Sequence, residues 1–178
     1  MLYTALAFGA NAAVADTAAL EALRDGDMKK LVFHAEPQAA SDTAFSDAEG
    51  GEHRLSDWQG KHVVLNFWAT WCAPCRKEMP MLDALQAEFG GDSFEVVTIA
   101  AGRNSVQGIR RFFEEVGVTN LPILLDPKQE LSREMGVFGL PITVILNPEG
   151  QEIARLRGEA DWESDSAKAI VAALISGS

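Results

Sequence analysis

The chain contains two cysteines, Cys72 and Cys75, separated by Ala73 and Pro74. Thiols at this spacing can interconvert between a dithiol and a disulfide, supply half of a zinc site, or form a structural bridge. A structural bridge that closes so short a loop adds little stability, because its entropic gain grows with loop length. The pair is therefore interpreted as redox-active.

The positions of the other possible ligands argue against a zinc site. Structural zinc requires four ligands. The three histidines, His34, His53 and His62, all precede the cysteines, and no two of them have the spacing of a ligand pair. We therefore predict no metal site, and no cofactor other than the Cys72–Cys75 disulfide itself.

The flanking elements place the pair where a strand becomes a helix. Residues 63–69 form an apolar run typical of a buried central strand. From Cys75 onward, apolar residues recur at three- and four-residue steps up to Phe89, which predicts a helix with one face in the core. Cys72 then lies at the first turn, where unpaired N–H groups and the helix dipole favour a thiolate. Pro74 suits the same turn, because its missing N–H costs nothing there.

This arrangement gives the two cysteines different roles. Cys72 is predicted to attack a disulfide, and Cys75, on the apolar face, to be the buried thiol that resolves the mixed disulfide. Glu78 follows Cys75 by three residues, and we predict that its carboxyl accepts the Cys75 proton, since burial raises the pKa of a carboxyl toward neutrality. Periodicity alone leaves an ordinary exposed glutamate equally open.

Length and charge limit the remaining possibilities. The chain has 178 residues, 47% of them hydrophobic, which suffices for one sizeable core. Its formal net charge is -11 at pH 7, and the basic residues are scattered along the sequence. We therefore expect one domain that acts as a monomer and does not bind nucleic acid.

The amino terminus has the composition of a targeting segment. Residues 2–15 are apolar and small, lack Lys and Arg, and end in Ala13-Val14-Ala15, which is typical of a secretory cleavage site. We therefore assign residues 1–15 to a signal or anchor remnant and expect a longer export signal or a membrane anchor in the natural protein. A surface helix rich in alanine is the alternative. Residues 16–41 are expected to form a lead-in arm, helical at first and then open.

The rest of the chain alternates between strands and helices. A turn at residues 49–51 predicts a hairpin within residues 43–55. The apolar patterns predict further strands at 94–100, 121–125, 142–146 and 151–157, and helices at 105–116, 128–135 and 164–175. This alternation indicates an α/β fold whose mostly parallel sheet is covered on both faces.

Residues 67–80, Phe-Trp-Ala-Thr-Trp-Cys-Ala-Pro-Cys-Arg-Lys-Glu-Met-Pro, resemble the active-site signature of the thioredoxin superfamily. The Arg-Lys-Glu-Met-Pro extension is similar to that of the TlpA/ResA-like branch, which comprises extracytoplasmic, often membrane-anchored thiol:disulfide oxidoreductases. The match continues through residues 139–143. It implies a thioredoxin-like fold with a central mixed, largely parallel sheet, helices on both faces and an N-terminal hairpin. The domain would span residues 42–178, with a helix-strand insert at 104–125.

The resemblance also implies site residues. Leu140-Pro141 matches the cis-proline loop of the family, which faces the disulfide and binds an extended peptide. Together with Trp71, Ala73 and Pro74 it forms the predicted substrate-binding surface. The branch has a glutamate in the register of Glu78, which favours its role as proton acceptor.

One residue departs from the pattern of the superfamily. Cytosolic thioredoxins carry a buried aspartate on the central strand, where this chain has Asn66. An amide cannot shuttle a proton, so Glu78 is expected to do so alone.

The function so implied is the reduction of protein disulfides in the periplasm or another extracytoplasmic compartment. The partners would be protein disulfides or dithiols and an upstream membrane thiol reductant, as in the biogenesis of cytochrome c or of copper oxidases. The segment Gly139-Leu140-Pro141-Ile142 lacks the acidic residue that follows the proline in dedicated cytochrome-maturation proteins. That absence favours copper-site assembly or a general reductase.

Two alternatives remain open at this point. A thiol-dependent peroxidase shares the fold but normally has a Pro and a Thr or Ser just before its cysteine, whereas here Thr70 is present without that Pro. A copper chaperone of the same fold uses cysteines spaced by three residues and a downstream histidine. No histidine follows His62 in this sequence.

Overall fold

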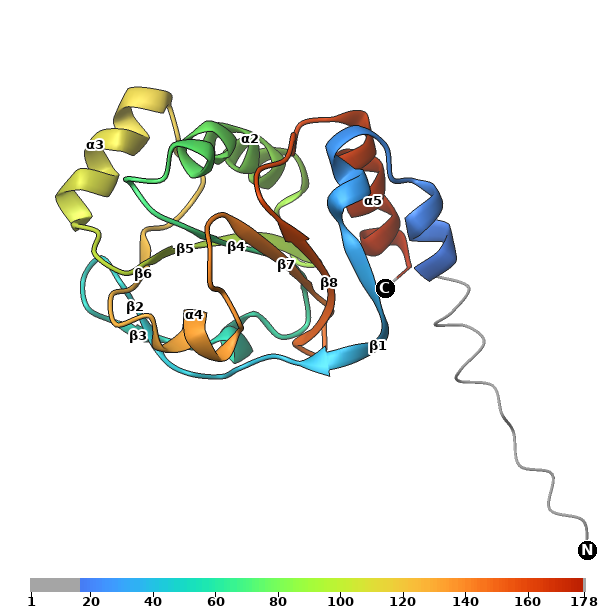
Figure 1. Cartoon of the computed structure of the whole chain (residues 1–178), viewed down its shortest axis with the longest axis horizontal. Coiled ribbons are helices and arrows are strands. Elements are labelled where there is room, and N and C mark those ends of the chain that lie inside the picture. Colours follow the sequence, from blue (N-terminus) through green and yellow to red (C-terminus); the bar gives the residue numbers. More distant parts are fainter. Residues whose placement is uncertain (1–16, 178) are drawn as a thin grey trace, which may run out of the picture.

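This computed structural model describes residues 17–177 of the chain. The strands in this part form one eight-stranded mixed sheet (Figure 1). The strand order is β1-β8-β7-β4-β5-β6-β2-β3. The strands are β1 Val32–Ala39, β2 Phe45–Asp47, β3 Glu52–His53, β4 His62–Trp68, β5 Phe94–Ala101, β6 Leu124–Asp126, β7 Ile142–Leu146 and β8 Gln151–Arg157. The α/β architecture with a mixed sheet confirms the predicted fold class.

Helices cover both faces of this sheet (Figure 1). The α-helices are α2 Ala73–Phe89, α3 Val106–Val116, α4 Glu130–Glu134 and α5 Asp165–Ser176, and short 3-10 helices span Gly26–Lys30 and Leu55–Trp58. Helices α2, α3 and α5 pack on one face and contribute to the larger of two apolar clusters. Helix α4 and the 3-10 helix Leu55–Trp58 pack on the other face.

Strand alternation explains why there are two clusters. On β4, Val63, Leu65 and Phe67 point to the face of α4, whereas Val64 and Trp68 point to the face of α2 and α3. Every residue of β4 is buried, because both faces of this central strand are covered. The apolar run predicted at residues 63–69 therefore lies in the buried centre of the sheet, as expected of a central strand.

The expectation of a largely parallel sheet is wrong. In the described residues, only the pairs β4–β5 and β5–β6 are parallel, and the other five pairings are antiparallel. Two of the antiparallel pairs, β2–β3 and β7–β8, are joined by short turns, which permit only antiparallel neighbours. The other three, β1–β8, β2–β6 and β4–β7, join strands that are far apart in the sequence. Helical crossovers are confined to the α2 and α3 segments.

Residues 32–39, expected to be an open part of a lead-in arm, instead form the edge strand β1. It pairs with β8 in an antiparallel register, Val32 opposite Arg155 and Ala39 opposite Gln151. The two strands are further joined by Glu152, whose carboxylate accepts hydrogen bonds from Arg155 and from His34. Burial alone would raise the pKa of Glu152, but these hydrogen bonds outweigh it and lower the pKa.

Smaller differences concern element boundaries and the amino terminus. The predicted strand at residues 121–125 is observed at Leu124–Asp126, and the predicted helix at 128–135 at Glu130–Glu134. The hairpin predicted within residues 43–55 is present as β2–β3.

Residues 1–15, predicted to carry targeting information, lie outside the described residues. None of the helices in the described part has the length and apolar character needed to cross a membrane.

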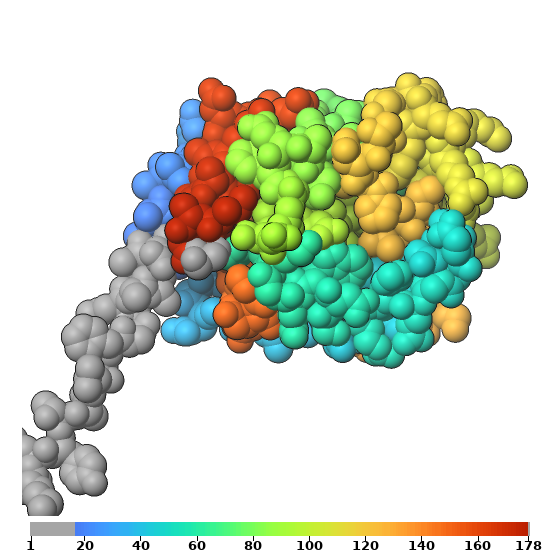
Figure 2. Space-filling model, turned by 180° about the vertical axis from the view of Figure 1, so that it is seen from behind, coloured from blue at the N-terminus to red at the C-terminus, as the bar shows by residue number. Residues whose placement is uncertain are grey.

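Helix α2 is held along its length by contacts with other elements. Asp83, in its middle, accepts hydrogen bonds from the backbone N–H groups of Thr119 and Asn120 in the loop after α3. Near its end, Glu88 pairs with Lys168 of α5, Oε2 to Nζ 2.6 Å. Seen from behind, these two segments, light green and red, lie side by side (Figure 2). The helix that carries the cysteines is therefore fixed in position.

If residues 17–41 belong to the folded unit, truncating their buried apolar side chains must destabilise it. Leu31 is fully buried in the larger cluster, so Leu31→Ala should lower the free energy of unfolding by roughly 2–5 kcal/mol. The exposed Leu23 is the matched control, and Leu23→Ala should cost less than about 1 kcal/mol. Urea unfolding of the oxidised protein measures both. If Leu31→Ala lowered the free energy of unfolding as little as Leu23→Ala does, residues 17–41 would not belong to the folded unit.

Candidate active site

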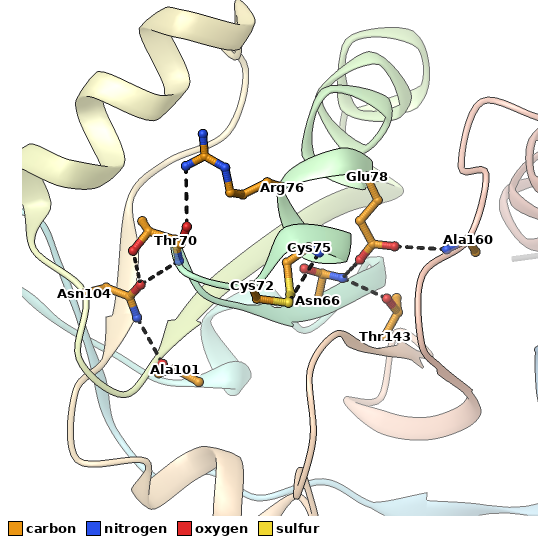
Figure 3. Close-up of a disulfide and its surroundings, with 10 residues drawn as sticks. All are labelled: Asn66, Thr70, Cys72, Cys75, Arg76, Glu78, Ala101, Asn104, Thr143 and Ala160. Carbon is orange, nitrogen blue, oxygen red and sulfur yellow. Dashed lines mark hydrogen bonds between the residues drawn. A yellow bond between two sulfur atoms is a disulfide. The ribbon is translucent and has the colours of Figure 1, made fainter.

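A disulfide joins Cys72 and Cys75 at the start of α2 (Figure 3). Cys72 is the N-cap residue, and its Sγ accepts a hydrogen bond from the backbone N–H of Cys75 at 3.4 Å. Pro74 lies in the first turn, as the sequence predicts. Cys72 keeps 6% of its surface exposed and Cys75 none, which confirms the predicted burial of Cys75.

The turn before the disulfide is anchored by Asn104, which follows β5. Asn104 Oδ1 accepts hydrogen bonds from the backbone N–H of Thr70 at 2.8 Å and from its hydroxyl at 3.0 Å. Its amide nitrogen donates to the carbonyl of Ala101 at 3.0 Å (Figure 3). Ser105 is the N-cap residue of the next helix, α3, which leaves Asn104 to position the cysteine loop.

Arg76 connects the first turn of α2 to α3. Its guanidinium carbon lies 4.1 Å from the ring centroid of Phe112, and its Nη2 lies 3.7 Å from a carboxylate oxygen of Glu115, both on α3. Phe113, beside Phe112, stacks on Trp68 at the end of β4. Helix α3 therefore packs against both the strand and the helix that flank the disulfide.

Glu78 lies fully buried beneath Cys75 and is surrounded by hydrogen-bond donors. Its Oε1 accepts from Asn66 Nδ2 at 2.7 Å, and its Oε2 accepts from Ala160 N at 3.1 Å and from Trp162 Nε1 at 3.3 Å. The loss of solvation raises the pKa of Glu78 to about 7, although each of these donors lowers it. The periodicity left an exposed glutamate open, and the structure excludes it.

A row of polar side chains crosses the central strands on the face that Glu78 contacts. Asn66 on β4 lies opposite Thr98 on β5 and Thr143 on β7, and all three are buried. Asn66 Nδ2 donates to Thr143 Oγ1 at 2.9 Å as well as to Glu78. Within residues 17–177, Asn66 Oδ1 and Thr98 Oγ1 have no hydrogen-bond partner. Figure 3 shows Asn66 Oδ1 turned toward the cysteines and its nitrogen toward Glu78.

The predicted substrate-binding residues lie at the same end of the sheet. The Leu140–Pro141 peptide bond is cis and directly precedes β7, whose first residue pairs with Phe67 near the end of β4. Trp71 and Leu140 line one hollow, and Trp71 keeps 67% of its surface exposed. Ala73 and Pro74 are exposed as well. The structure thus places these residues around the disulfide, and their role in binding remains a prediction.

Sequence reasoning missed several residues of the site. Thr143 was detectable, since it is the one polar residue in the apolar strand Ile142–Leu146 and therefore marks a buried polar contact. Ala160 and Trp162 contact Glu78 from a loop more than 80 positions away in the sequence. No local sequence pattern indicates such a contact. In the described part of the chain, no cluster of three or more His, Cys, Asp or Glu side chains is arranged to hold a metal ion.

Comparison with known proteins gives a consistent result. The sequence profile of the AhpC/TSA family matches residues 37–153. The thiol-disulfide oxidoreductase ResA of Geobacillus thermodenitrificans is 38% identical over 112 residues, which are 63% of this chain and 63% of that protein. The chain thus spans slightly less than two thirds of the length of this relative.

Two further comparisons extend over more of the related protein. The thioredoxin-like protein YneN of Bacillus subtilis is 39% identical over 124 residues, 68% of this chain and 71% of YneN. Among solved structures, the exposed lipoprotein thioredoxin Etrx1 of Streptococcus pneumoniae is 30% identical and superposes with a TM-score of 0.61. That match covers 75% of this chain and 98% of Etrx1. The fold is therefore thioredoxin-like, as the sequence indicated.

The raised pKa of Glu78 predicts a specific pH dependence of stability. An unfolded glutamate titrates near 4.5 and the folded one near 7, so the folded state binds the proton more tightly. The stability that this group contributes is fully present below pH 4.5 and is lost as the pH rises to about 7. Because Gln does not titrate, the free energy of unfolding of Glu78→Gln should rise by roughly 3 kcal/mol relative to that of the parent as the pH increases from 4.5 to about 7.

Urea unfolding of both oxidised proteins at several pH values measures this difference. Glu95→Gln is a suitable control, because Glu95 is a partly exposed residue paired with Lys61. A stability difference between Glu78→Gln and the parent that does not vary with pH would contradict the raised pKa.

Proposed function

The chain belongs to the AhpC/TSA family of thioredoxin-like proteins, and we propose that it is a thiol:disulfide oxidoreductase that reduces protein disulfides. The observation that carries this proposal is the Cys72–Cys75 disulfide at the start of α2 with the buried carboxyl of Glu78 beneath it. A carboxyl whose pKa is about 7 is half ionised near neutral pH and can therefore accept and return a proton. The relative named thiol-disulfide oxidoreductase supports the same activity.

The proposed reaction starts from the dithiol form. The thiolate of Cys72 attacks one sulfur of the substrate disulfide, which forms a mixed disulfide and releases one substrate thiolate to take a proton from water. Cys75 then gives its proton to Glu78, attacks Cys72 Sγ and expels the second substrate thiolate. Two electrons have passed from the protein dithiol to the substrate, and the Cys72–Cys75 disulfide has formed. An external dithiol reductant restores the starting state.

Asn66 is proposed to position Glu78 for the proton transfer. Its amide nitrogen holds Glu78 Oε1 at 2.7 Å, and its unpartnered Oδ1 is turned toward the cysteines. A polar hollow lined by Asp27, Lys77 and Glu159 lies beside Glu78 and offers the proton a route to solvent.

The setting of the reaction is proposed to be extracytoplasmic. Etrx1, an exposed lipoprotein, has this fold, and the targeting pattern of residues 2–15 agrees with export. The substrates would be protein thiols and disulfides, and the reductant a membrane thiol protein. Biogenesis of copper oxidases or of cytochrome c, and an amino-terminal membrane anchor, belong to this same proposal.

Neither alternative gains support from the site. In a thiol-dependent peroxidase the hydroxyl before the cysteine must be available, but here the Thr70 hydroxyl donates to Asn104 Oδ1. In a copper chaperone we expect a third ligand, and the sequence has no histidine after the cysteines.

Substitution of each cysteine separates the two roles. Cys72→Ser should abolish the reduction of insulin disulfides, whereas Cys75→Ser should retain one reactive thiol and accumulate mixed disulfides with substrate. Insulin turbidity and mass spectrometry of trapped adducts measure these outcomes. Faster turnover of hydrogen peroxide than of insulin by the parent would favour the peroxidase. Earlier alkylation of Cys75 than of Cys72 in the reduced protein would reverse the assignment.

Removal of the buried carboxyl should slow the resolving step. Glu78→Gln should lower the rate of disulfide reduction at neutral pH by roughly a hundredfold, the range ascribed to general base catalysis. The deficit should shrink as pH rises, because hydroxide then ionises Cys75 directly. The fold should persist, since a flip of the Asn66 amide lets its free Oδ1 accept from Gln at position 78.

Adding Asn66→Asp to this variant tests whether proton transfer is the lost step. Asp at position 66 lies in the same polar row and should restore part of the activity. Unchanged activity of Glu78→Gln, with an unchanged pH profile, would exclude Glu78 from proton transfer.

A further inference from the structure

Two exposed aromatic side chains flank the approach to the disulfide. Among residues 17–177, Phe138 and Trp71 are the most exposed large apolar residues, with 88% and 67% of their surfaces accessible. They are far apart in the sequence, yet both line the hollow that contains Leu140. In Figure 1 the loop between α4 and β7 runs beside the loop that leads from β4 into α2. Exposed aromatic surface of this kind is typical of a binding site.

Phe138 lines two hollows, which share residues 138–140. The first hollow, on the side of Trp71, includes Arg133. The second includes Pro141 and Arg157. In each hollow the single charged side chain is an arginine, and no carboxylate lines either one. This is notable in a chain whose net charge is -11.

Neither arginine is neutralised by a carboxylate in the described part of the chain. Arg133 donates a hydrogen bond to the carbonyl of Lys128, and Arg157 forms no ion pair. By contrast, Arg76 and Lys77 on the other side of the disulfide are paired with Glu115 and Glu159. Each of the two hollows beside Phe138 therefore carries one positive charge that no carboxylate in residues 17–177 pairs with.

We propose that this surface, made of Trp71, Phe138, Arg133 and Arg157, selects protein segments whose cysteine is flanked by a large apolar side chain and by acidic residues. The proposal rests on the proposed function, because it names the class of substrate that the same disulfide would serve. The apolar side chain packs against Phe138 in one of the hollows, and the carboxylates pair with the arginines.

The two arginines are expected to affect the orientation and the association rate of the substrate more than its affinity. Exposed ion pairs contribute little to binding, but complementary charge raises association rates and disfavours wrong partners. Because charges farther than about 10 Å are screened at moderate salt, the two arginines act locally even though the protein as a whole repels an acidic partner. The aromatic pair supplies the contact area.

Short peptides dimerised through a single cysteine provide the test. One peptide has Phe before the cysteine and Glu at the neighbouring positions. Three others replace Glu by Gln, Glu by Lys, or Phe by Ser. Release of the peptide thiol by the reduced protein gives a second-order rate constant for each. At about 0.1 M salt the Glu peptide should react about tenfold faster than the Lys peptide, and about 1 M salt, where the screening length falls to about 3 Å, should remove the difference.

Variants assign this preference to residues. Arg133→Gln with Arg157→Gln should abolish the discrimination between Glu and Lys peptides, and Phe138→Ser should lower the rate for the Phe peptides by about fivefold without affecting the Ser peptide. The matched controls are Arg111→Gln, an exposed arginine on α3, and Val32→Ser, an apolar residue with 53% exposure on β1. Both controls should behave like the parent.

A small neutral disulfide, 2-hydroxyethyl disulfide, distinguishes failure of this inference from failure of the proposed function. All variants should reduce it at the parental rate, which also reports an intact active site. If the parent reduces neither this compound nor any peptide, the proposed function itself is wrong. If the parent reduces all peptides equally, or if Phe138→Ser matches Val32→Ser, the substrate preference proposed for this surface is overturned.

Discussion

The structure around the disulfide depends on the burial of one ionisable group, the carboxyl of Glu78. A carboxyl removed from water is costly unless donors replace its solvation. Here the donors come from β4 and from the loop between β8 and α5, through Asn66, Ala160 and Trp162. These segments must be in place before Glu78 can be buried, so the geometry of the active site follows from the packing of the whole sheet. Desolvation still outweighs the donors, and this excess raises the pKa of Glu78 to about 7, which suits the proposed proton transfer.

Helix α3 and the loops on either side of it hold the cysteine loop in place. Asn104 holds Thr70, Phe112 lies under Arg76, and the loop after α3 is pinned to Asp83 of α2. These three contacts connect the loop before the disulfide, the first turn of α2 and the middle of α2 to α3 and its flanking loops. A site held by a second layer of contacts keeps its reacting groups aligned. Helix α3 and its flanking loops therefore support the cysteine loop although they contribute no cysteine or carboxyl group to it.

The sequence predicted the parts of the fold whose signals are local. The strand-to-helix junction at the cysteines, the amphipathic helices and the β2–β3 hairpin follow from periodicity and turn residues. Strand β1 was missed because its residues are largely exposed and include Pro37, so it lacks the pattern of a core strand. The parallel content was overestimated because periodicity does not reveal which strands become neighbours. Likewise, the burial of Glu78 could be proposed from spacing, whereas Trp162 could not, since only tertiary packing brings it there.

The residues proposed to handle the proton and those proposed to select the substrate lie on different segments that meet at one strand, β7. The polar row below the disulfide uses side chains of β4, β5 and β7, whereas the proposed recognition surface uses the loop before α2, helix α4 with the loop after it, and the end of β8. Strand β7 belongs to both: Thr143 contacts Asn66, and Ile142 pairs with Phe67 on one side and with Arg157 on the other. The register that aligns Thr143 with the buried row therefore also fixes where Arg157 reaches the surface. Substitutions at Phe138 or Arg157 can change the preferred partner without disturbing Glu78, whereas a shift of β7 would alter both at once.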